Sequence, residues 1–334
     1  MATCLRETMA FRRAANNQVS MVQANLLLSL LKRASKTDYG CKYGFASIRS
    51  VNDYRERVPV NDYDDLQPWI ERIANCGDQV LTADRVLLFE ETSGTGGGTR
   101  LIPYTAGLQA SFNRALHPWL FDLHSHYSGI WGGPAYWAVS PRSNGSRKTP
   151  GGITIGFAND SDYFGRWAKP LIKALTIVPE EVAGLSDPMA WRYVTVLSLL
   201  RSPDMRLVSL WNPGLFTALL GSIEEWADVL SADLIAGTCK PGFLKTESLA
   251  GFENFTGKPS ARRAEVFKEA LRMRKSGNNA EFARLLWPRI ALVSSWSEAE
   301  ASGSAAYLKS FFPDAFYQTK GLLATEGPVT VPMT

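Results

Sequence analysis

Apolar residues recur at helical spacing along several parts of the chain, and this spacing predicts helices. Within residues 1–36 the apolar positions recur three and four residues apart, at Val19, Val22, Leu26 and Leu30, which predicts an amphipathic helix. Further helices are predicted over 66–74, 105–127, 191–200, 215–230 and 298–311, with two polar helices over 258–284. Asn61 or Asp62 is expected to cap the helix over 66–74, and Pro118 is expected to kink or divide the helix over 105–127.

Short apolar runs bounded by polar or turn residues predict buried strands. They cover 86–89, 136–141, 153–157, 206–211 and 289–296, and residues 316–319 are also expected to be extended. Strands that alternate with helices are typical of an α/β fold with a mainly parallel sheet flanked by helices. In such sheets, ligands bind at the carboxyl ends of the strands.

A glycine-rich stretch follows the first predicted strand. It reads Thr92-Ser93-Gly94-Thr95-Gly96-Gly97-Gly98-Thr99-Arg100. Glycines allow the backbone to approach a ligand closely, and successive N–H groups form an anion-binding concavity. The stretch fits neither the Walker pattern nor the dinucleotide pattern G-x-G-x-x-G. It is therefore either a phosphate loop of a third kind or a turn that binds nothing.

Two other segments follow apolar runs in the same way. They are Ser294-Ser295-Trp296 and Ala324-Thr325-Glu326. Since strand ends at one sheet edge share a ligand site, the convergence of these segments with the glycine stretch favours a nucleotide site.

Composition narrows the class of protein. The chain has 334 residues, 45% of them hydrophobic and 20% charged, with a net charge of +4, so one large or two medium globular domains are expected. No basic stripe indicates a nucleic-acid partner. No run approaches the roughly 20 apolar residues of a membrane span, so no membrane partner is expected.

The cysteines and histidines do not indicate a metal site. The four cysteines are scattered, which suits a reduced, cytoplasmic setting. The three histidines, at 117, 124 and 126, have no carboxylate or thiol set beside them that would complete a metal site. They are interpreted as ordinary core or surface residues.

Two motifs and several blocks between them resemble a known family. The stretch from Thr92 to Thr105 resembles the first nucleotide motif of the auxin-responsive promoter family of acyl-acid amido synthetases, members of the adenylate-forming superfamily. The stretch from Lys320 to Gly327 resembles that family's second motif, especially in its bacterial branch. The likeness extends nearly end to end, so the resemblance implies the N-terminal large domain of such an enzyme.

The resemblance implies an activity and a set of site residues. Family members use Mg-ATP to convert a carboxylic acid into an acyl-adenylate, which an amine, usually of an amino acid, then attacks. Glu326 matches the metal-binding glutamate and is a catalytic candidate with Arg100. The resemblance places the nucleotide against Thr92, Ser93, Gly94, Thr95, Gly96, Gly97, Gly98, Ser294, Ser295, Ala324 and Thr325. It places the acyl substrate near Arg114, Tyr136 and Trp211, whereas Lys320 is interpreted as an ordinary lysine at a strand end.

The chain departs from the family pattern in two places. Arg100 stands where the family usually has lysine, which keeps the charge but changes the geometry. The chain also stops at Thr334, soon after the second motif. It is expected to be an incomplete large domain over 1–334, with a helical segment at 1–80, an ATP- and acyl-binding region at 81–334, and no small C-terminal domain.

Other functions remain open on the sequence. The acyl acceptor could be a thiol instead of an amine, or the chain could be an inactive, nucleotide-binding remnant. The sequence identifies neither the acid nor the amine, and it does not give the oligomeric state.

Overall fold

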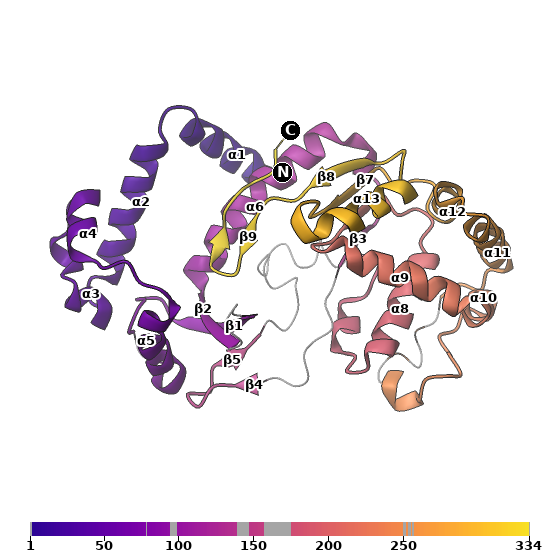
Figure 1. Cartoon of the computed structure of the whole chain (residues 1–334), viewed down its shortest axis with the longest axis horizontal. Coiled ribbons are helices and arrows are strands. Elements are labelled where there is room, and N and C mark those ends of the chain that lie inside the picture. The colour runs from indigo at the N-terminus through magenta and orange to yellow at the C-terminus, as the bar shows by residue number, and fades with distance from the viewer. Residues whose placement is uncertain are drawn as a thin grey trace. The chain divides into compact units, whose positions relative to one another are not determined.

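The computed structural model of the chain contains two compact units (Figure 1). It describes residues 2–77, 79–93, 99–138, 147–156, 175–249 and 257–333, with Phe252 and Phe255. Unit 1 comprises 1–121, 145–158 and 322–331, and unit 2 comprises 122–144, 159–321 and 332–334.

Unit 1 begins with helices whose ends follow from local sequence. They are α1 (Ala2–Ala15), α2 (Val19–Ala34), α3 (Asp38–Lys42), α4 (Val51–Arg57) and α5 (Tyr63–Cys76), with a 3₁₀ turn at Phe45–Ser47. The Asp62 side chain accepts a hydrogen bond from the Asp65 backbone, and the Asp65 carboxylate accepts one from the Asp62 backbone. This reciprocal capping box starts α5 and confirms Asp62 as the cap.

A mixed sheet completes unit 1. It has the order β2-β1-β5-β4, where β1 is Val86–Ser93, β2 is Thr99–Thr105, β4 is Arg147–Lys148 and β5 is Thr154–Ile155. Strand β1 runs antiparallel to β2 and parallel to β5. One face packs on α5 through Ile73, Val86 and Phe89. A separate hairpin pairs β9 (Leu323–Ala324) with β10 (Gly327–Pro328).

Unit 2 is built on a fully parallel sheet, as the sequence predicts. Its order is β3-β6-β7-β8, with bounds Ala135–Trp137, Leu207–Ser209, Leu292–Ser295 and Phe316–Thr319. Tyr136, Val208, Val293 and Tyr317 lie side by side in register. They face the main hydrophobic core of this unit.

Helices of unit 2 supply the rest of that core (Figure 1). They are α8 (Pro188–Leu200), α9 (Pro213–Glu225), α10 (Ala227–Ala236), α11 (Ala261–Lys275), α12 (Asn279–Leu286) and α13 (Ser302–Phe311). Short 3₁₀ turns lie at Ser128–Ile130, Glu180–Gly184, Thr246–Leu249 and Ala299–Ala301. Helix α8 is buried along ten of its residues, as an apolar sequence on all sides predicts.

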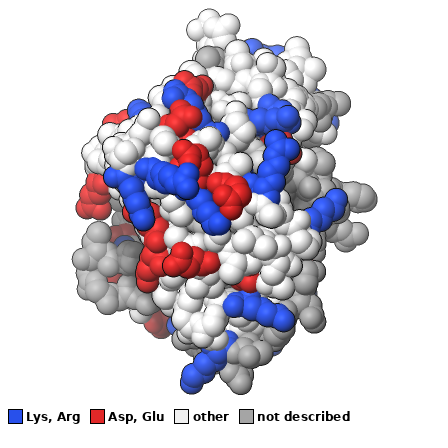
Figure 2. Space-filling view, turned by 90° about the vertical axis from the view of Figure 1, so that its right-hand side faces the viewer, with Lys and Arg blue, Asp and Glu red and all other residues white. Residues whose placement is uncertain are grey.

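Charges of both signs alternate on the outer face of unit 2. Figure 2 shows basic and acidic side chains interspersed there. Ion pairs on this unit include Lys268 with Glu265 at 2.8 Å and Arg284 with Asp314 at 2.7 Å. Exposed pairs of this kind are typical of a solvated face and add little stability.

Two local features refine what the sequence indicates. The glycine stretch leads into strand β2 before the helix begins, because Ile102 and Tyr104 are buried as β2 pairs with β1. Helix α6 (Ala106–His126) continues through Pro118 as one element, so the proline does not divide it.

The apolar periodicity of α2 predicts the helix but not the face that it buries. Val19, Val22, Leu26 and Leu30 are exposed. The buried contacts come instead from Leu31, with Leu27, Leu28 and Ala34 partly buried beside it. Within the described part of the chain, every helix falls short of the length or apolar character needed to cross a bilayer.

Candidate active site

The two strands that flank the glycine stretch hold its ends together. Thr92 pairs with Arg100 and Ser93 with Thr99 across the β1–β2 ladder. The residues between them, Gly94 to Gly98, lie outside the described residues.

Helix α5 secures the strand that carries Arg100. The Leu101 N–H donates to the Tyr63 hydroxyl at 2.8 Å, and the Arg100 guanidinium lies 5.1 Å from the centre of the Tyr63 ring. Such a cation–π contact orients a guanidinium while leaving its N–H groups able to donate. In the same sheet, Arg147 of β4 forms an ion pair with Glu91 of β1, across the intervening β5.

Glu326 occupies the turn between β9 and β10. The turn is closed by the pairing of Ala324 with Gly327, and the Leu322 N–H donates to the Thr330 hydroxyl at 2.7 Å. Glu326 is exposed and Thr325 half-buried, so the carboxylate is accessible at the tip of a defined hairpin.

The donor chemistry of Glu326 fits magnesium. No group of three or more His, Cys, Asp and Glu side chains among the described residues could hold a metal by itself. Magnesium, however, commonly uses one or two carboxylates together with phosphate oxygens and water. One accessible carboxylate therefore suits a magnesium ion that arrives with a nucleotide.

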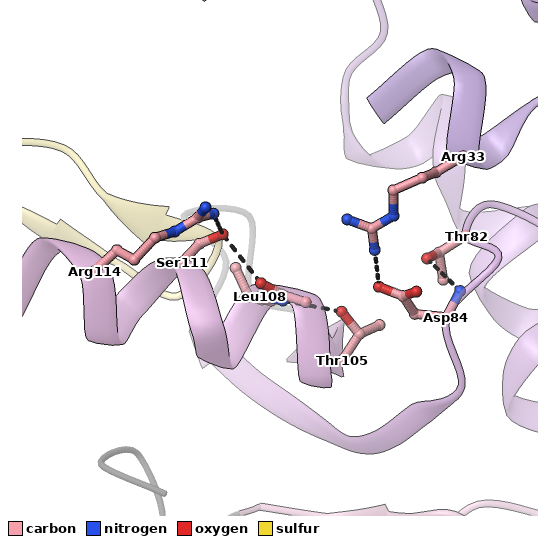
Figure 3. Close-up of polar contacts among 8 residues, drawn as sticks. Arg33, Thr82, Asp84, Thr105, Leu108, Ser111 and Arg114 are labelled. Carbon is pink, nitrogen blue, oxygen red and sulfur yellow. Dashed lines mark hydrogen bonds and ion pairs between the residues drawn. The ribbon is translucent and has the colours of Figure 1, made fainter. Parts of the chain in front are cut away.

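Helix α6 carries Arg114 on its exposed side. The Arg114 guanidinium donates to the Ser111 hydroxyl of the preceding turn at 3.2 Å, as Figure 3 shows. The helix starts where the Thr105 hydroxyl accepts from the Leu108 N–H at 3.1 Å. Arg114 is thus a surface residue stabilised by its own helix.

An ion pair lies beside the first turn of α6. Arg33 of α2 and Asp84 point toward one another beside this turn (Figure 3). A Cβ on Gly107 would lie 2.5 Å from the Asp84 carboxylate. A larger residue at 107 would therefore displace the Asp84 carboxylate from this position.

In unit 2, the nucleotide candidates Ser294 and Ser295 lie at the carboxyl end of β7. Both are fully buried. The Ser294 hydroxyl donates to the Gln318 side chain at 3.4 Å, and the Ser295 hydroxyl donates to the Trp296 carbonyl at 2.9 Å. Their hydroxyls therefore take part in hydrogen bonds inside this unit.

The two aromatic substrate candidates occupy different places in unit 2. Tyr136 is buried in the main core, with its ring 5.9 Å from that of Phe216, and its hydroxyl is buried without a hydrogen-bond partner in the described structure. Trp211 lies beyond the carboxyl end of β6, 41% exposed, with its ring 5.7 Å from the Trp296 ring.

Sequence reasoning missed a polar row in unit 2. Ser209, Ser294 and Gln318 are in register on neighbouring strands and nearly inaccessible. Lys320, two residues beyond Gln318, donates from Nζ to the Ser209 hydroxyl at 2.9 Å. The available signal was the alternation of Gln318 and Lys320, because side chains two apart in a strand share a face.

The structure groups the predicted site residues into two sets. Unit 1 contains Thr92, Ser93, Arg100, Arg114 and the Ala324–Glu326 turn, whereas unit 2 contains Ser294, Ser295, Tyr136 and Trp211. Each set lies at strand ends or turns, except for Arg114 on a helix and Tyr136 in a core.

Comparison with known proteins gives consistent matches to one family. A model of the GH3 family N-terminal domain matches residues 9–316. The indole-3-acetic acid-amido synthetase GH3.3 of Arabidopsis thaliana is 27% identical over 241 residues, which are 70% of this chain and 40% of that protein. The putative indole-3-acetic acid-amido synthetase GH3.10 of Oryza sativa subsp. japonica is 32% identical over 232 residues, which are 67% of this chain and 47% of that protein.

Solved structures share the fold. The AtGH3.15 acyl acid amido synthetase in complex with 2,4-DB superposes with a TM-score of 0.79 at 17% identity, covering 97% of this chain and 57% of that chain. The α/β class expected from the sequence is therefore confirmed. The chain spans about half the length of the relatives that it matches.

Proposed function

The chain belongs to the GH3 family, and on that premise we propose that the protein is an ATP-dependent acyl-acid amido synthetase. The match of the family domain to residues 9–316 carries the proposal. The names of the relatives support it, since those proteins are called amido synthetases. The substrates would be a small carboxylic acid, ATP and an amine, usually of an amino acid.

The first reaction would join the acid to the nucleotide. A carboxylate oxygen attacks the α-phosphorus of ATP, a P–O bond forms, and pyrophosphate leaves. Negative charges approach one another in this step, so fixed N–H donors and a cation lower its barrier. The backbone of residues 92–98 and the Arg100 guanidinium would supply them.

Glu326 would hold the magnesium ion. When bound, this ion neutralises phosphate charge and orients the leaving pyrophosphate. Ser294, Ser295, Ala324 and Thr325 would line the adenine side. Arg114, Tyr136 and Trp211 are proposed for the acyl side.

The second reaction would release the amide. The amine attacks the acyl carbon of the acyl-adenylate, a C–N bond forms, and AMP leaves with the electrons of the broken C–O bond. Because an amine must lose its proton in this step, amide formation should slow at pH values where the acceptor amine is fully protonated.

The protein is proposed to work in the cytoplasm without a membrane or nucleic-acid partner. None of its four cysteines forms a disulfide in the structure, which suits a reduced compartment.

The proposal is tested by thermal unfolding with and without Mg-ATP. A ligand at about 100 times its dissociation constant adds roughly 2.7 kcal/mol, so wild type should gain a few degrees in Tm. Glu326→Ala and Gly96→Val should lose that gain. Glu300→Ala removes another exposed carboxylate and should still show the gain in Tm.

Product analysis then tests the reaction itself. Pyrophosphate release that depends on a carboxylic acid, followed by amide formation with an amino acid, is the expected result. Nucleotide binding without pyrophosphate release from any acid would indicate an inactive remnant. Transfer to a thiol in place of an amine would contradict the amido synthetase assignment.

A further inference from the structure

Tyr63 contacts the strand that carries Arg100 through both of its parts, the hydroxyl and the ring. It is the first residue of α5, directly after the Asp62 cap. The Leu101 N–H donates to the Tyr63 hydroxyl at 2.8 Å, and this hydroxyl donates to the Leu101 carbonyl at 3.3 Å. The centre of the ring lies 5.1 Å from the Arg100 guanidinium. One side chain therefore holds the backbone of residue 101 and the side chain of residue 100.

The hydroxyl acts where a further strand would pair. In the described part of the sheet, β2 is an edge strand with β1 on its inner side, and an edge strand presents backbone N–H and C=O groups that no ladder satisfies. The last two pairs before the glycine stretch are Thr92 with Arg100 and Ser93 with Thr99. Because the Tyr63 hydroxyl bonds to both groups of Leu101, it stabilises the edge immediately beside these pairs.

The ring orients the Arg100 side chain without neutralising it. An aromatic face attracts a guanidinium and leaves its N–H groups able to donate. Three other arginines of unit 1 are held by carboxylates instead: Arg33 by Asp84, Arg72 by Asp38 and Arg147 by Glu91. The contact with Tyr63 therefore leaves the charge of Arg100 for an anion.

An arginine that is already ordered binds an anion more tightly than a free one. The arginine side chain has several rotatable bonds, and ordering such a side chain against a ligand reduces affinity about threefold to tenfold. Where the ring of Tyr63 already holds the guanidinium, this loss of freedom precedes binding. Tyr63 can thus raise the affinity for a ligand that only Arg100 contacts.

We propose that Tyr63 is a positioning residue that orders Arg100 for a phosphate of the nucleotide. This inference rests on the proposed function, in which Arg100 offsets phosphate charge. The two parts of Tyr63 have separate roles. The ring raises the affinity for the nucleotide through Arg100, and the hydroxyl stabilises the edge of β2.

Two substitutions of Tyr63 separate these roles. Isothermal titration calorimetry of the whole chain measures the dissociation constant of Mg-ATP, and urea unfolding measures the free energy of unfolding. Tyr63→Phe keeps the ring, so it should lower the free energy of unfolding but leave the dissociation constant within about twofold of wild type. Tyr63→Leu should raise the dissociation constant about threefold to tenfold. Tyr63→Gln, which keeps a polar group without the ring, should raise it equally, including if the leucine variant folds poorly.

A double-mutant cycle tests whether Tyr63 acts through Arg100. Arg100→Met should raise the dissociation constant of Mg-ATP about tenfold to a hundredfold, as loss of a charged hydrogen bond does. In that background Tyr63→Leu should have no further effect, because the residue that it positions is gone. Arg100→Lys keeps the charge without the planar group that stacks on a ring. It provides a second background if methionine abolishes binding, and there Tyr63→Leu should change the dissociation constant by less than about twofold.

Arg72→Met is the matched control. Arg72 also lies over a ring of α5, 5.7 Å from the centre of the Trp69 ring, but it forms an ion pair with Asp38. Removing this guanidinium should leave the dissociation constant of Mg-ATP unchanged.

Three results would overturn the inference. Tyr63→Leu and Tyr63→Gln could bind Mg-ATP as tightly as wild type. Tyr63→Phe could weaken binding as much as Tyr63→Leu, which would assign the effect to the hydroxyl. Tyr63→Leu could cause the same loss with and without the Arg100 guanidinium, as a merely structural role would. Failure of the proposed function looks different, because wild type would then show no binding of Mg-ATP at all.

Discussion

The ammonium of Lys320 makes stability depend on pH in a direction that can be checked. Burial lowers its pKa from the ordinary 10.5 to about 7. Between those values the unfolded chain keeps a proton that the folded chain has lost. The free energy of unfolding therefore rises with pH across this window.

Lys320→Met removes that dependence. From pH 7 to pH 9, the free energy of unfolding of wild type should increase by about 2 kcal/mol relative to the variant. Urea unfolding of both proteins at the two pH values measures it. Parallel changes in the two proteins would show that Lys320 keeps its proton in the folded state.

Asp233 is a buried carboxylate whose role is structural. Its oxygens accept from the Tyr193 hydroxyl at 2.7 Å and from the Lys240 N–H at 2.8 Å. Burial, with the Asp233 hydrogen bond second, raises the pKa of Tyr193. The carboxylate therefore ties α8 to the residues that follow α10.

Removing this carboxylate should destabilise unit 2. Asp233→Ala leaves buried donors without an acceptor and should lower the free energy of unfolding by about 2–4 kcal/mol. Asp233→Asn keeps an acceptor oxygen and should lower the free energy of unfolding by less. Chemical denaturation followed by tryptophan fluorescence measures both, and equal losses would mean that the hydrogen bonds contribute little.

At the level of the element, α2 shows that apolar periodicity predicts a helix without predicting which of its residues are buried. Leu30 is 48% exposed, and its neighbour Leu31 is 4% exposed in a cluster with Tyr39, Phe45 and Ile48. Helical spacing alone puts Leu30 in the apolar set. Contacts with α3 and the following turn decide that Leu31 is the buried one.

The two leucines form a matched pair for mutation. Leu31→Ala should cost about 2–4 kcal/mol through lost burial and a cavity. Leu30→Ala should change the free energy of unfolding by no more than about 0.5 kcal/mol. Urea unfolding of the two variants tests this, and a larger loss for Leu30→Ala would show that its face is covered in solution.

At the scale of the whole molecule, each unit has a hydrophobic core of its own. Ile73 of α5 lies in the core of unit 1, and Leu308 of α13 lies in the core of unit 2; both are fully buried. Units with separate cores can unfold separately, in which case a single two-state transition does not describe the chain.

Calorimetry with one substitution in each core tests this separation. Ile73→Ala and Leu308→Ala should each cost about 2–5 kcal/mol and should each shift a different one of two unfolding transitions. A single transition that both variants lower would indicate one cooperative molecule. The exposed Leu30→Ala variant is the control that should shift neither.

The predicted site illustrates the limit of local reasoning. The segments at 92–100, 294–296 and 324–326 were found because glycine, serine and acidic residues follow apolar runs, a signal contained in consecutive residues. For Lys320 the only local signal was its alternation with Gln318, which indicates a shared face of a strand but not burial. Its importance arises from Ser209 and Trp211, more than a hundred residues earlier in the chain.

The sequence by itself determined the α/β class, most helices and strands, a helix cap at Asn61 or Asp62, and the two motifs, because each depends on residues a few positions apart. Only the tertiary structure decided that 99–105 pairs as a strand, which face of α2 is buried, that Tyr136 faces a core, and that Lys320 is covered. Those features depend on pairing and burial between distant segments, which no local pattern specifies.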